Sequence, residues 1–222
     1  MVSVEAAGIL FDMDGVLISS IGSVNRCWRR WTRHYGIAGW ETFEIPHGTR
    51  AVDVIRTLKP ELDVVEGLRL IEDMELDDVA DLQVLPGARA LLASLPAERW
   101  AIVTSATHRL LLGRLAAAEL PVPERMISGD MVERGKPDPE PYRRGAELIG
   151  SGGAAPADCV VVEDAPSGVG AGVAAGCLVL GVLGSHSEAE LREAGVSWVV
   201  QSLEDVSATT SPQGLVIRMN TL

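Results

Sequence analysis

The chain has 222 residues, of which 47% are hydrophobic and 23% charged, as in a folded globular protein. It contains 19 basic and 31 acidic residues, so its formal net charge is −12. This charge argues against nucleic acid as a partner, because neutralised phosphates supply most of that affinity. It argues equally against an anionic membrane surface. A small phosphorylated substrate stays compatible, since a few local cations override the average field.

No apolar run approaches the ~20 residues that a membrane-spanning helix needs. We expect no signal peptide, because residues 1–15 carry no basic segment and soon reach acids. The cysteines, Cys27, Cys159 and Cys177, are odd in number and match no metal or redox spacing. We therefore expect free, buried thiols in a reducing compartment, and a cytoplasmic protein.

Short apolar runs alternate with helix-like stretches along most of the chain. We predict strands at residues 4–11, 100–103, 126–127, 159–162, 178–182 and 198–200. Several runs are continuously apolar, which is typical of parallel strands covered by helices on both faces. The sequence thus predicts an α/β fold with a doubly wound, mostly parallel, Rossmann-like sheet. After Asp205 the pattern is ambiguous, and residues 215–217 are a candidate for one last short strand.

Residues 18–82 break this alternation. Apolar residues from Val24 to Tyr35 fall at helical spacing, with arginines between them. Residues 61–81 hold nine acids, one base and a second apolar stripe, and no strand is predicted in either part. We therefore expect a helical cap domain at 18–82, inserted into an α/β core domain made of 1–17 and 83–222. Pro86-Gly87 marks the return to the core.

Polar groups gather at the carboxyl ends of the predicted strands, the edge where ligands bind in open α/β sheets. Four segments carry them: Asp12-Met13-Asp14-Gly15, Thr104-Ser105, Lys136-Pro137 and Glu163-Asp164. In this order they resemble the motifs of the haloacid dehalogenase-like superfamily of phosphatases. The resemblance covers nearly the whole chain, on both sides of the insertion. Dehalogenases of that superfamily lack an aspartate at the position of Asp14, so its presence favours phosphoryl transfer.

The first segment suits attack on a phosphate monoester. Asp12 and Asp14 lie two residues apart on an extended chain and project to the same side. Asp12 is the candidate nucleophile, which forms an aspartyl phosphate. Asp14 is the candidate general acid toward the leaving alkoxide, and then the general base toward water. The alternative is an acidic turn that caps the next helix.

The other segments supply groups that bind phosphate. Thr104 and Ser105 offer hydroxyl donors to phosphate oxygens, although Thr104 could simply be the N-cap of the next helix. Lys136 offers a charge that stabilises the transferring phosphoryl group. Its alternative is an exposed loop lysine, although the chain has only one other lysine, Lys59.

Carboxylates at this edge also predict a magnesium site. Carboxylate oxygens are natural ligands of Mg²⁺, which would offset the repulsion between nucleophile and phosphate dianion. We expect Mg²⁺ to be bound by Asp12, Asp14 and Asp164. Glu163 is expected as a further ligand or as a residue that supports the ligands.

Residues 46–53, PHGTRAVD, resemble the cap loop of sugar- and polyol-phosphate phosphatases, including glycerol phosphatases and 2-deoxyglucose-6-phosphatases. His47, Gly48 and Arg50 are therefore candidate substrate-binding residues. His47 and Arg50 could hydrogen-bond substrate hydroxyls or a carboxylate when the cap closes. The alternative for Arg50 is a salt bridge to Asp53 or to an acidic cap helix.

The expected function is Mg²⁺-dependent hydrolysis of a small phosphorylated metabolite, with no nucleic acid and no membrane as partner. We expect a monomer by default, with a weak dimer as the alternative. A β-phosphoglucomutase also resembles this chain, but that family carries a histidine in the first cap helix, where this chain has Val24. The minor alternative is a non-catalytic protein that binds a phosphometabolite. Where such phosphatases often have aspartate, this chain has Ser19.

Overall fold

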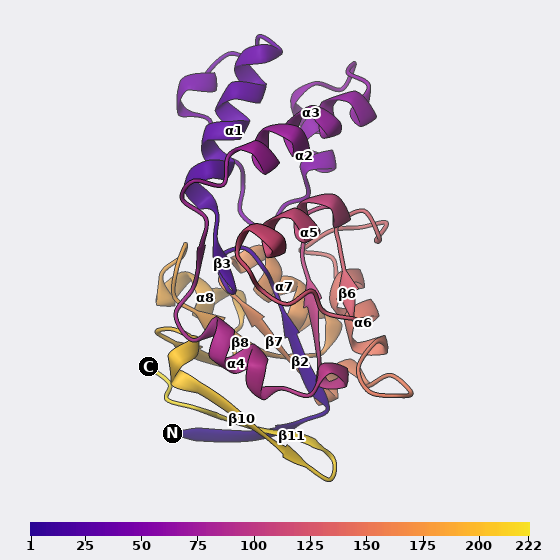
Figure 1. Cartoon of the computed structure of the whole chain (residues 1–222), viewed down its shortest axis with the longest axis vertical. Helices are drawn as coiled ribbons and strands as arrows, with labels where there is room; N and C mark the ends of the chain where they lie inside the picture. The colour runs from indigo at the N-terminus through magenta and orange to yellow at the C-terminus, as the bar shows by residue number, and fades with distance from the viewer.

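The computed structural model describes all 222 residues. Its central sheet has six parallel strands in the order β6, β5, β2, β7, β8, β9 (Figure 1). The strands are β2 (Gly8–Phe11), β5 (Trp100–Val103), β6 (Met126–Ile127), β7 (Cys159–Glu163), β8 (Leu178–Val182) and β9 (Trp198–Val200). β2 pairs with β5 on one side and with β7 on the other, so the strand order reverses beside it. This order confirms the predicted doubly wound sheet. In such sheets, ligands bind at the carboxyl ends of the strands, near the point where the strand order reverses.

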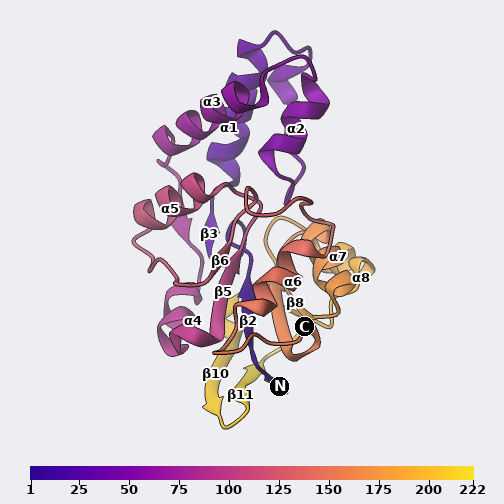
Figure 2. The same cartoon turned by 90° about the vertical axis from the view of Figure 1, so that its right-hand side faces the viewer.

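Helices cover both faces of this sheet (Figure 2). One face packs against α4 (Ala88–Ser94) and α5 (His108–Ala117), and the other against α6 (Glu140–Glu147), α7 (Pro166–Ala175) and α8 (Glu188–Ala194). Every residue of β5 is buried, because its side chains alternate between two cores: Ile102 belongs to the α5 side and Val103 to the α6 side. Short 3₁₀ turns lie at Trp40–Thr42, Ala97–Arg99, Pro156–Asp158 and Leu203–Asp205. No helix has both the length and the apolar character required to cross a bilayer.

The predicted strand at residues 4–11 is in fact two strands. β1 (Val2–Ala6) leaves the central sheet and pairs antiparallel with β11 (Gly214–Met219), which pairs in turn with β10 (Val206–Ser211). Ser3 and Glu5 are exposed between less exposed neighbours, an alternation that suits a sheet with one face in solvent. The ambiguous tail therefore forms two strands, and residues 215–217 lie within the second.

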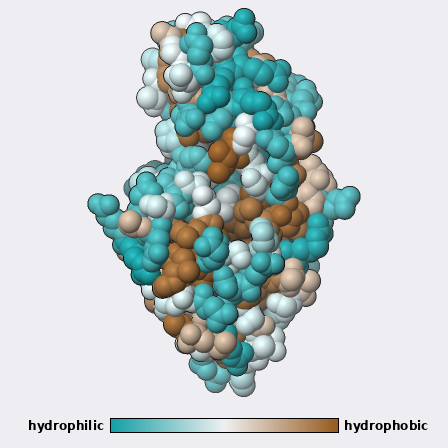
Figure 3. All heavy atoms as spheres, turned by 90° about the vertical axis from the view of Figure 1, so that its left-hand side faces the viewer, coloured by the Kyte–Doolittle hydropathy of each residue, from teal (hydrophilic) through white to brown (hydrophobic).

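Three helices form a lobe above the carboxyl edge of the sheet: α1 (Ile21–His34), α2 (Ala51–Leu58) and α3 (Val64–Asp77) (Figure 1). The lobe has its own core, made of Cys27, Trp28, Trp31, Val54, Ile55 and Ile71. On the face seen in Figure 3, hydrophilic side chains cover most of the lobe's outer surface.

A pair of two-residue strands lies where the lobe joins the core. β3 (Ile18–Ser19) runs antiparallel to β4 (Gln83–Val84). The expectation that residues 18–82 contain no strand is therefore wrong at the first two residues. Strands of two residues are too short to produce an alternating pattern in the sequence. Their pairing holds the two connections to the lobe side by side.

Candidate functional site

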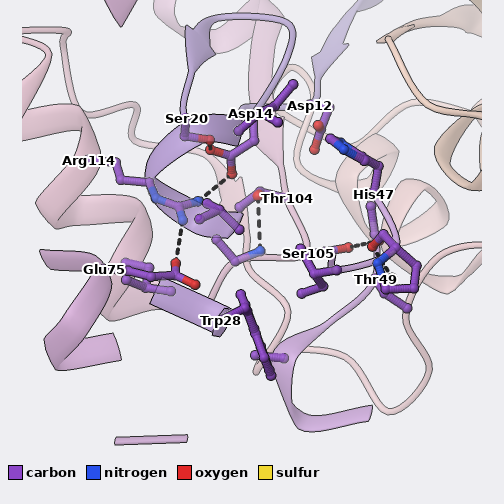
Figure 4. Close-up of a pocket in the computed structure, with 18 of the residues that line it drawn as sticks. Asp12, Asp14, Ser20, Trp28, His47, Thr49, Glu75, Thr104, Ser105 and Arg114 are labelled. Carbon is purple, nitrogen blue, oxygen red and sulfur yellow. Dashed lines mark hydrogen bonds and ion pairs between the residues drawn. The ribbon is translucent and has the colours of Figure 1, made fainter. Parts of the chain in front are cut away.

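A pocket lies between the carboxyl edge of the sheet and the helical lobe (Figure 4). The core contributes Asp12, Asp14, Thr104, Ser105, Arg114 and Asp164 to its lining, and the lobe with its loop contributes Asn25, Trp28, His47, Gly48, Thr49 and Glu75. Parallel strands end at one edge of a sheet, so residues about 90 and 150 positions apart meet here. The four sequence segments thus converge on one place.

Asp12 follows β2 and is in direct contact with Lys136. The Nζ of Lys136 donates to Oδ1 of Asp12 at 2.7 Å and to Oε1 of Glu163 at 2.6 Å. The side chain of Lys136 is 1% exposed, so the alternative of an exposed loop lysine is wrong. Burial raises the pKa of Asp12 well above its usual value, although Lys136 opposes this shift. Burial acts against the charge of Lys136, but the two carboxylates outweigh it and raise the lysine's pKa.

Glu163 is held by contacts to both of its carboxylate oxygens. Besides Lys136, Oε1 accepts a hydrogen bond from the hydroxyl of Tyr142 at 2.6 Å. Oε2 accepts from the backbone N–H groups of Asp164 and Ala165, at 3.1 and 3.3 Å. Such a fully hydrogen-bonded carboxylate suits a residue that fixes the position of Lys136. Tyr142 lies on α6 with no motif around it, so it could not be identified as a site residue from the sequence.

Three carboxylates at this edge could hold a metal ion. Oxygens of Asp12, Glu163 and Asp164 all lie within 4.8 Å of one another, and the three residues are buried. Burial and the charge of Glu163 raise the pKa of Asp164 to about 7, although a hydrogen bond from Ser185 acts to lower it. A divalent cation between them would offset both burial and repulsion, and an all-oxygen donor set suits Mg²⁺. The residues therefore fit the expected ion.

Gly15 allows Asp164 to lie close to the loop after β2. Its φ is +88°, a left-handed conformation, and a Cβ at this position would overlap the Asp164 carboxylate. Glycine is the residue that adopts this conformation without steric cost. Glycine at position 15 therefore lets this loop pass close to the Asp164 carboxylate.

The carboxylate of Asp14 lies apart from this acidic group. Its Oδ1 accepts a hydrogen bond from Ser20 Oγ at 2.5 Å, and its Oδ2 accepts one from Arg114 Nη1 at 2.6 Å (Figure 4). The Asp14 carboxylate is therefore not among the oxygens gathered at Asp12, and the role of Asp14 as a metal ligand stays a prediction. Asp14 is partly exposed there, so it is accessible to a bound molecule.

Thr104 and Ser105 line the pocket just after β5. Oγ1 of Thr104 accepts a hydrogen bond from the N–H of Ala106 at 3.1 Å. Oγ of Ser105 donates to the carbonyl of Gly48 at 2.5 Å and thereby connects the core to the lobe's loop. The N-cap of α5 is Thr107, whose side chain accepts from the N–H of Leu110. The alternative reading of Thr104 as that N-cap is therefore wrong.

His47 and Gly48 bring the loop before α2 against the core. The ring of His47 packs edge-on against the ring of His186, with centroids 5.5 Å apart. Burial and the neighbouring His186 lower the pKa of His47, which favours its neutral form. Gly48 has a φ of +76°, and a Cβ there would overlap Oγ of Ser167. His47 and Gly48 both line the pocket, and their contact with substrate stays a prediction.

Arg50, by contrast, lies outside this pocket. Its Nε donates to Asp53 Oδ2 at 2.7 Å, and its Nη1 donates to the carbonyls of Val132 at 2.9 Å and Gly129 at 3.3 Å. The salt bridge to Asp53, which the sequence left open as the alternative, is thus the observed arrangement. Because Val132 and Gly129 belong to the core, Arg50 ties the lobe to the core, and its predicted contact with substrate needs this correction.

Comparisons with known proteins agree with these motifs. The profile of the family described as haloacid dehalogenase-like hydrolase matches residues 6–176. Hexitol phosphatase A from Escherichia coli (strain K12) is 40% identical to this chain, over 95% of the chain and 97% of that protein. 2-Deoxyglucose-6-phosphate phosphatase 2 from Saccharomyces cerevisiae is 32% identical, over 95% of this chain and 94% of that protein.

Solved structures share the fold. A hydrolase from Pseudomonas syringae superposes with a TM-score of 0.77 at 24% identity, over 88% of this chain and 94% of its own. Others that match are titled putative β-phosphoglucomutases, from Thermotoga maritima and Bacteroides vulgatus. On the evidence of profile, relatives and fold together, the chain belongs to the haloacid dehalogenase-like hydrolases.

Proposed function

We propose that this protein is a Mg²⁺-dependent phosphatase that hydrolyses a phosphate monoester of a sugar or polyol through an aspartyl phosphate. The observation that carries this proposal is the buried contact between Asp12 and Lys136, beside Asp164, where Asp12 and Asp164 line the pocket. The names of the relatives support it, since both are phosphatases, one of hexitols and one of a sugar phosphate.

In the first step, an oxygen of Asp12 attacks phosphorus and the bond from phosphorus to the substrate alkoxide breaks. Asp14 gives its proton to the departing alkoxide. The hydroxyls of Thr104 and Ser105 and the ammonium of Lys136 stabilise the phosphoryl oxygens, and Glu163 holds Lys136 in place. Mg²⁺ held by Asp12 and Asp164 would offset the negative charge of nucleophile and phosphate.

In the second step, water attacks the phosphorus of the aspartyl phosphate and the bond to Asp12 breaks. Asp14, now ionised, takes the proton of that water, and inorganic phosphate leaves. Asp12 and Asp14 both return to their starting protonation states, so the cycle consumes one water per phosphate ester. Neither step needs an oxidant or a second substrate.

The helical lobe, residues 18–82, acts as the cap that selects the substrate. It contributes the apolar face of Trp28 and the polar groups of Asn25, Thr49 and Glu75 to the pocket lining. A mixture of one large aromatic face and several hydrogen-bonding groups suits a molecule with carbon-bound hydroxyls. We include a monomeric state and a cytoplasmic location in the proposal, the latter because all three cysteines are free and buried.

The direct test is hydrolysis of 4-nitrophenyl phosphate with and without Mg²⁺, followed by hexitol phosphates, 2-deoxyglucose 6-phosphate and glycerol 1-phosphate. Asp12→Asn should abolish turnover and leave the fold intact. Asp73→Asn is the matched control, because Asp73 is exposed on α3 outside the pocket, and this variant should keep activity. Turnover that survives Asp12→Asn would exclude Asp12 as the nucleophile. A folded wild type without any turnover would favour the non-catalytic alternative.

A β-phosphoglucomutase remains the second candidate, because structures with that title share the fold. Val24 lines the pocket at the position where the mutases carry a histidine, and a valine cannot exchange a proton. This favours hydrolysis. Glucose 6-phosphate formed from β-glucose 1-phosphate would instead support the mutase.

A further inference from the structure

One arginine connects the candidate acid and base, Asp14, to the helical lobe. Arg114 lies in the last turn of α5, and its Nη1 donates to Asp14 Oδ2 at 2.6 Å. Its Nη2 donates to Oε2 of Glu75, which lies on α3 of the lobe. A single guanidinium is therefore shared between a carboxylate of the core and a carboxylate of the lobe (Figure 4).

The shared guanidinium is well shielded from water. The side chains of Arg114 and Glu75 are 7% and 5% exposed, whereas that of Asp14 is 27% exposed. A buried cation that loses its last anionic partner is strongly destabilised. Arg114 can therefore release Asp14 at low cost only while Glu75 holds the other side of the guanidinium.

The orientation of Asp14 matters for its proposed work. In this structure both of its oxygens are occupied, by Ser20 and by Arg114, and it is not among the carboxylates gathered around Asp12. To give a proton to an alkoxide leaving the phosphoryl group at Asp12, its carboxyl must leave Arg114 and turn toward that group. A contact that governs this release governs the protonation of the leaving group.

We propose that Arg114 is a positioning residue that couples the helical lobe to Asp14, with Glu75 as the lobe's contact in this coupling. The inference rests on the proposed function of Asp14 as general acid. While Glu75 holds Arg114, Asp14 is free to turn toward the leaving oxygen. When Glu75 withdraws with the lobe, Arg114 keeps Asp14 as its remaining anionic partner and holds it back. Acid catalysis is thereby restricted to the arrangement in which the lobe contacts the core.

Glu75→Gln tests this coupling, because it keeps the size of the side chain and an acceptor oxygen but removes the charge. Arg114 should then hold Asp14 more tightly. The kcat/KM for glycerol 1-phosphate, whose alkoxide needs a proton, should fall at least about fivefold more than that for 4-nitrophenyl phosphate, whose phenolate leaves without one. Because kcat/KM covers binding and the first irreversible step, the later hydrolysis of the aspartyl phosphate does not enter this ratio.

Asp73→Asn is the matched control. Asp73 also lies on α3 and also pairs with an arginine of α5, Arg109, at 2.6 Å, but this pair does not touch Asp14. It should leave the ratio of the two substrates unchanged. An equal shift in Asp73→Asn would mean that the effect comes from general contact between lobe and core, and the proposal would be wrong.

The role of Arg114 itself is tested by the double variant Glu75→Gln/Arg114→Gln. If Glu75 acts through Arg114, its selective effect should disappear in the Arg114→Gln background. The proposal would be overturned if the selective effect of Glu75→Gln persisted in the Arg114→Gln background. It would also be overturned if Glu75→Gln lowered kcat/KM equally on both substrates, or did not lower it at all. The single Glu75→Gln comparison decides the matter if Arg114→Gln does not fold. Asp14→Asn distinguishes failure of the coupling from failure of the proposed function. If this variant shows no selective loss on glycerol 1-phosphate, then the assignment of Asp14 as general acid is wrong, and not only the coupling.

Discussion

Replacement of Lys136 by methionine should destabilise the protein and abolish most of its activity. The ammonium group is 1% exposed and donates to Asp12 at 2.7 Å and to Glu163 at 2.6 Å. Removing it leaves two buried carboxylates without their cation, which costs ~3–5 kcal/mol of unfolding free energy. At about 2–4 °C per kcal/mol for a chain of this length, the melting temperature should fall by ~6–20 °C.

Loss of the lysine should also slow phosphoryl transfer. Lys136 opposes the rise in the pKa of Asp12 that burial causes, so without it the nucleophile is less often ionised. Removal of one group that stabilises charge in a transition state costs about 10²–10³ in kcat. The assay is hydrolysis of 4-nitrophenyl phosphate, together with thermal unfolding followed by circular dichroism. Added Mg²⁺ should recover part of the lost melting temperature, because it binds the folded state preferentially.

The chain offers a matched control in its only other lysine. Lys59 pairs with Glu61 at 2.8 Å, and the Glu61 side chain is 66% exposed. Lys59→Met removes the same charge and adds the same methionine, but an exposed pair of this kind contributes little to stability because water screens it. If the Lys136 and Lys59 variants melted at the same temperature and retained equal turnover, the reasoning about the buried contact would be refuted.

Three further changes test other parts of the site. Gly15→Ala forces a left-handed φ on alanine and places a Cβ against Asp164. It should lower the free energy of unfolding by ~1–3 kcal/mol in thermal unfolding and weaken Mg²⁺ binding. An unchanged stability and Mg²⁺ affinity would contradict the overlap. Asp164→Asn should lower the Mg²⁺ affinity, measured by titration calorimetry, at least ~10–100-fold. That is the loss typical of residues that only support a metal ligand. An unaltered affinity would exclude Asp164 as a ligand. Arg50→Ala should reduce activity on glycerol 1-phosphate and 4-nitrophenyl phosphate by equal factors, because Arg50 ties the lobe to the core; a changed ratio between the substrates would place it in substrate selection after all.

Much of the core could be predicted because its strands carry strong local patterns. β5 and β7 are apolar at almost every position, which predicts burial on both faces and hence a parallel sheet. Once the strands are known, Asp12, Thr104 and Asp164 must meet at one edge, since each follows the carboxyl end of a parallel strand. This reasoning places side chains without any knowledge of the loops between them.

The small antiparallel pieces carried no such pattern. β3 and β4 have two residues each, too few for any period to be visible. β1 continues directly into the apolar run of β2, and its partner lies at the opposite end of the chain, where Val2 pairs with Met219. Pairings of this kind are decided by tertiary packing and not by the local sequence.

Two of the arginines that join the lobe to the core, Arg50 and Arg114, show the same limit at the level of single side chains. Arg50 has an acid three residues ahead on the same helix face, so the spacing alone offers Asp53 as a partner. Arg114 meets Glu75 and Asp14, which lie 39 and 100 residues away in the sequence. A helical pattern places Arg114 on a face of α5, but only the packing of α3 against α5 decides which carboxylates it touches. The contact with the clearest consequence for catalysis is thus the one that depends on how the lobe is placed against the core, and movement of the lobe is the means by which it can be broken.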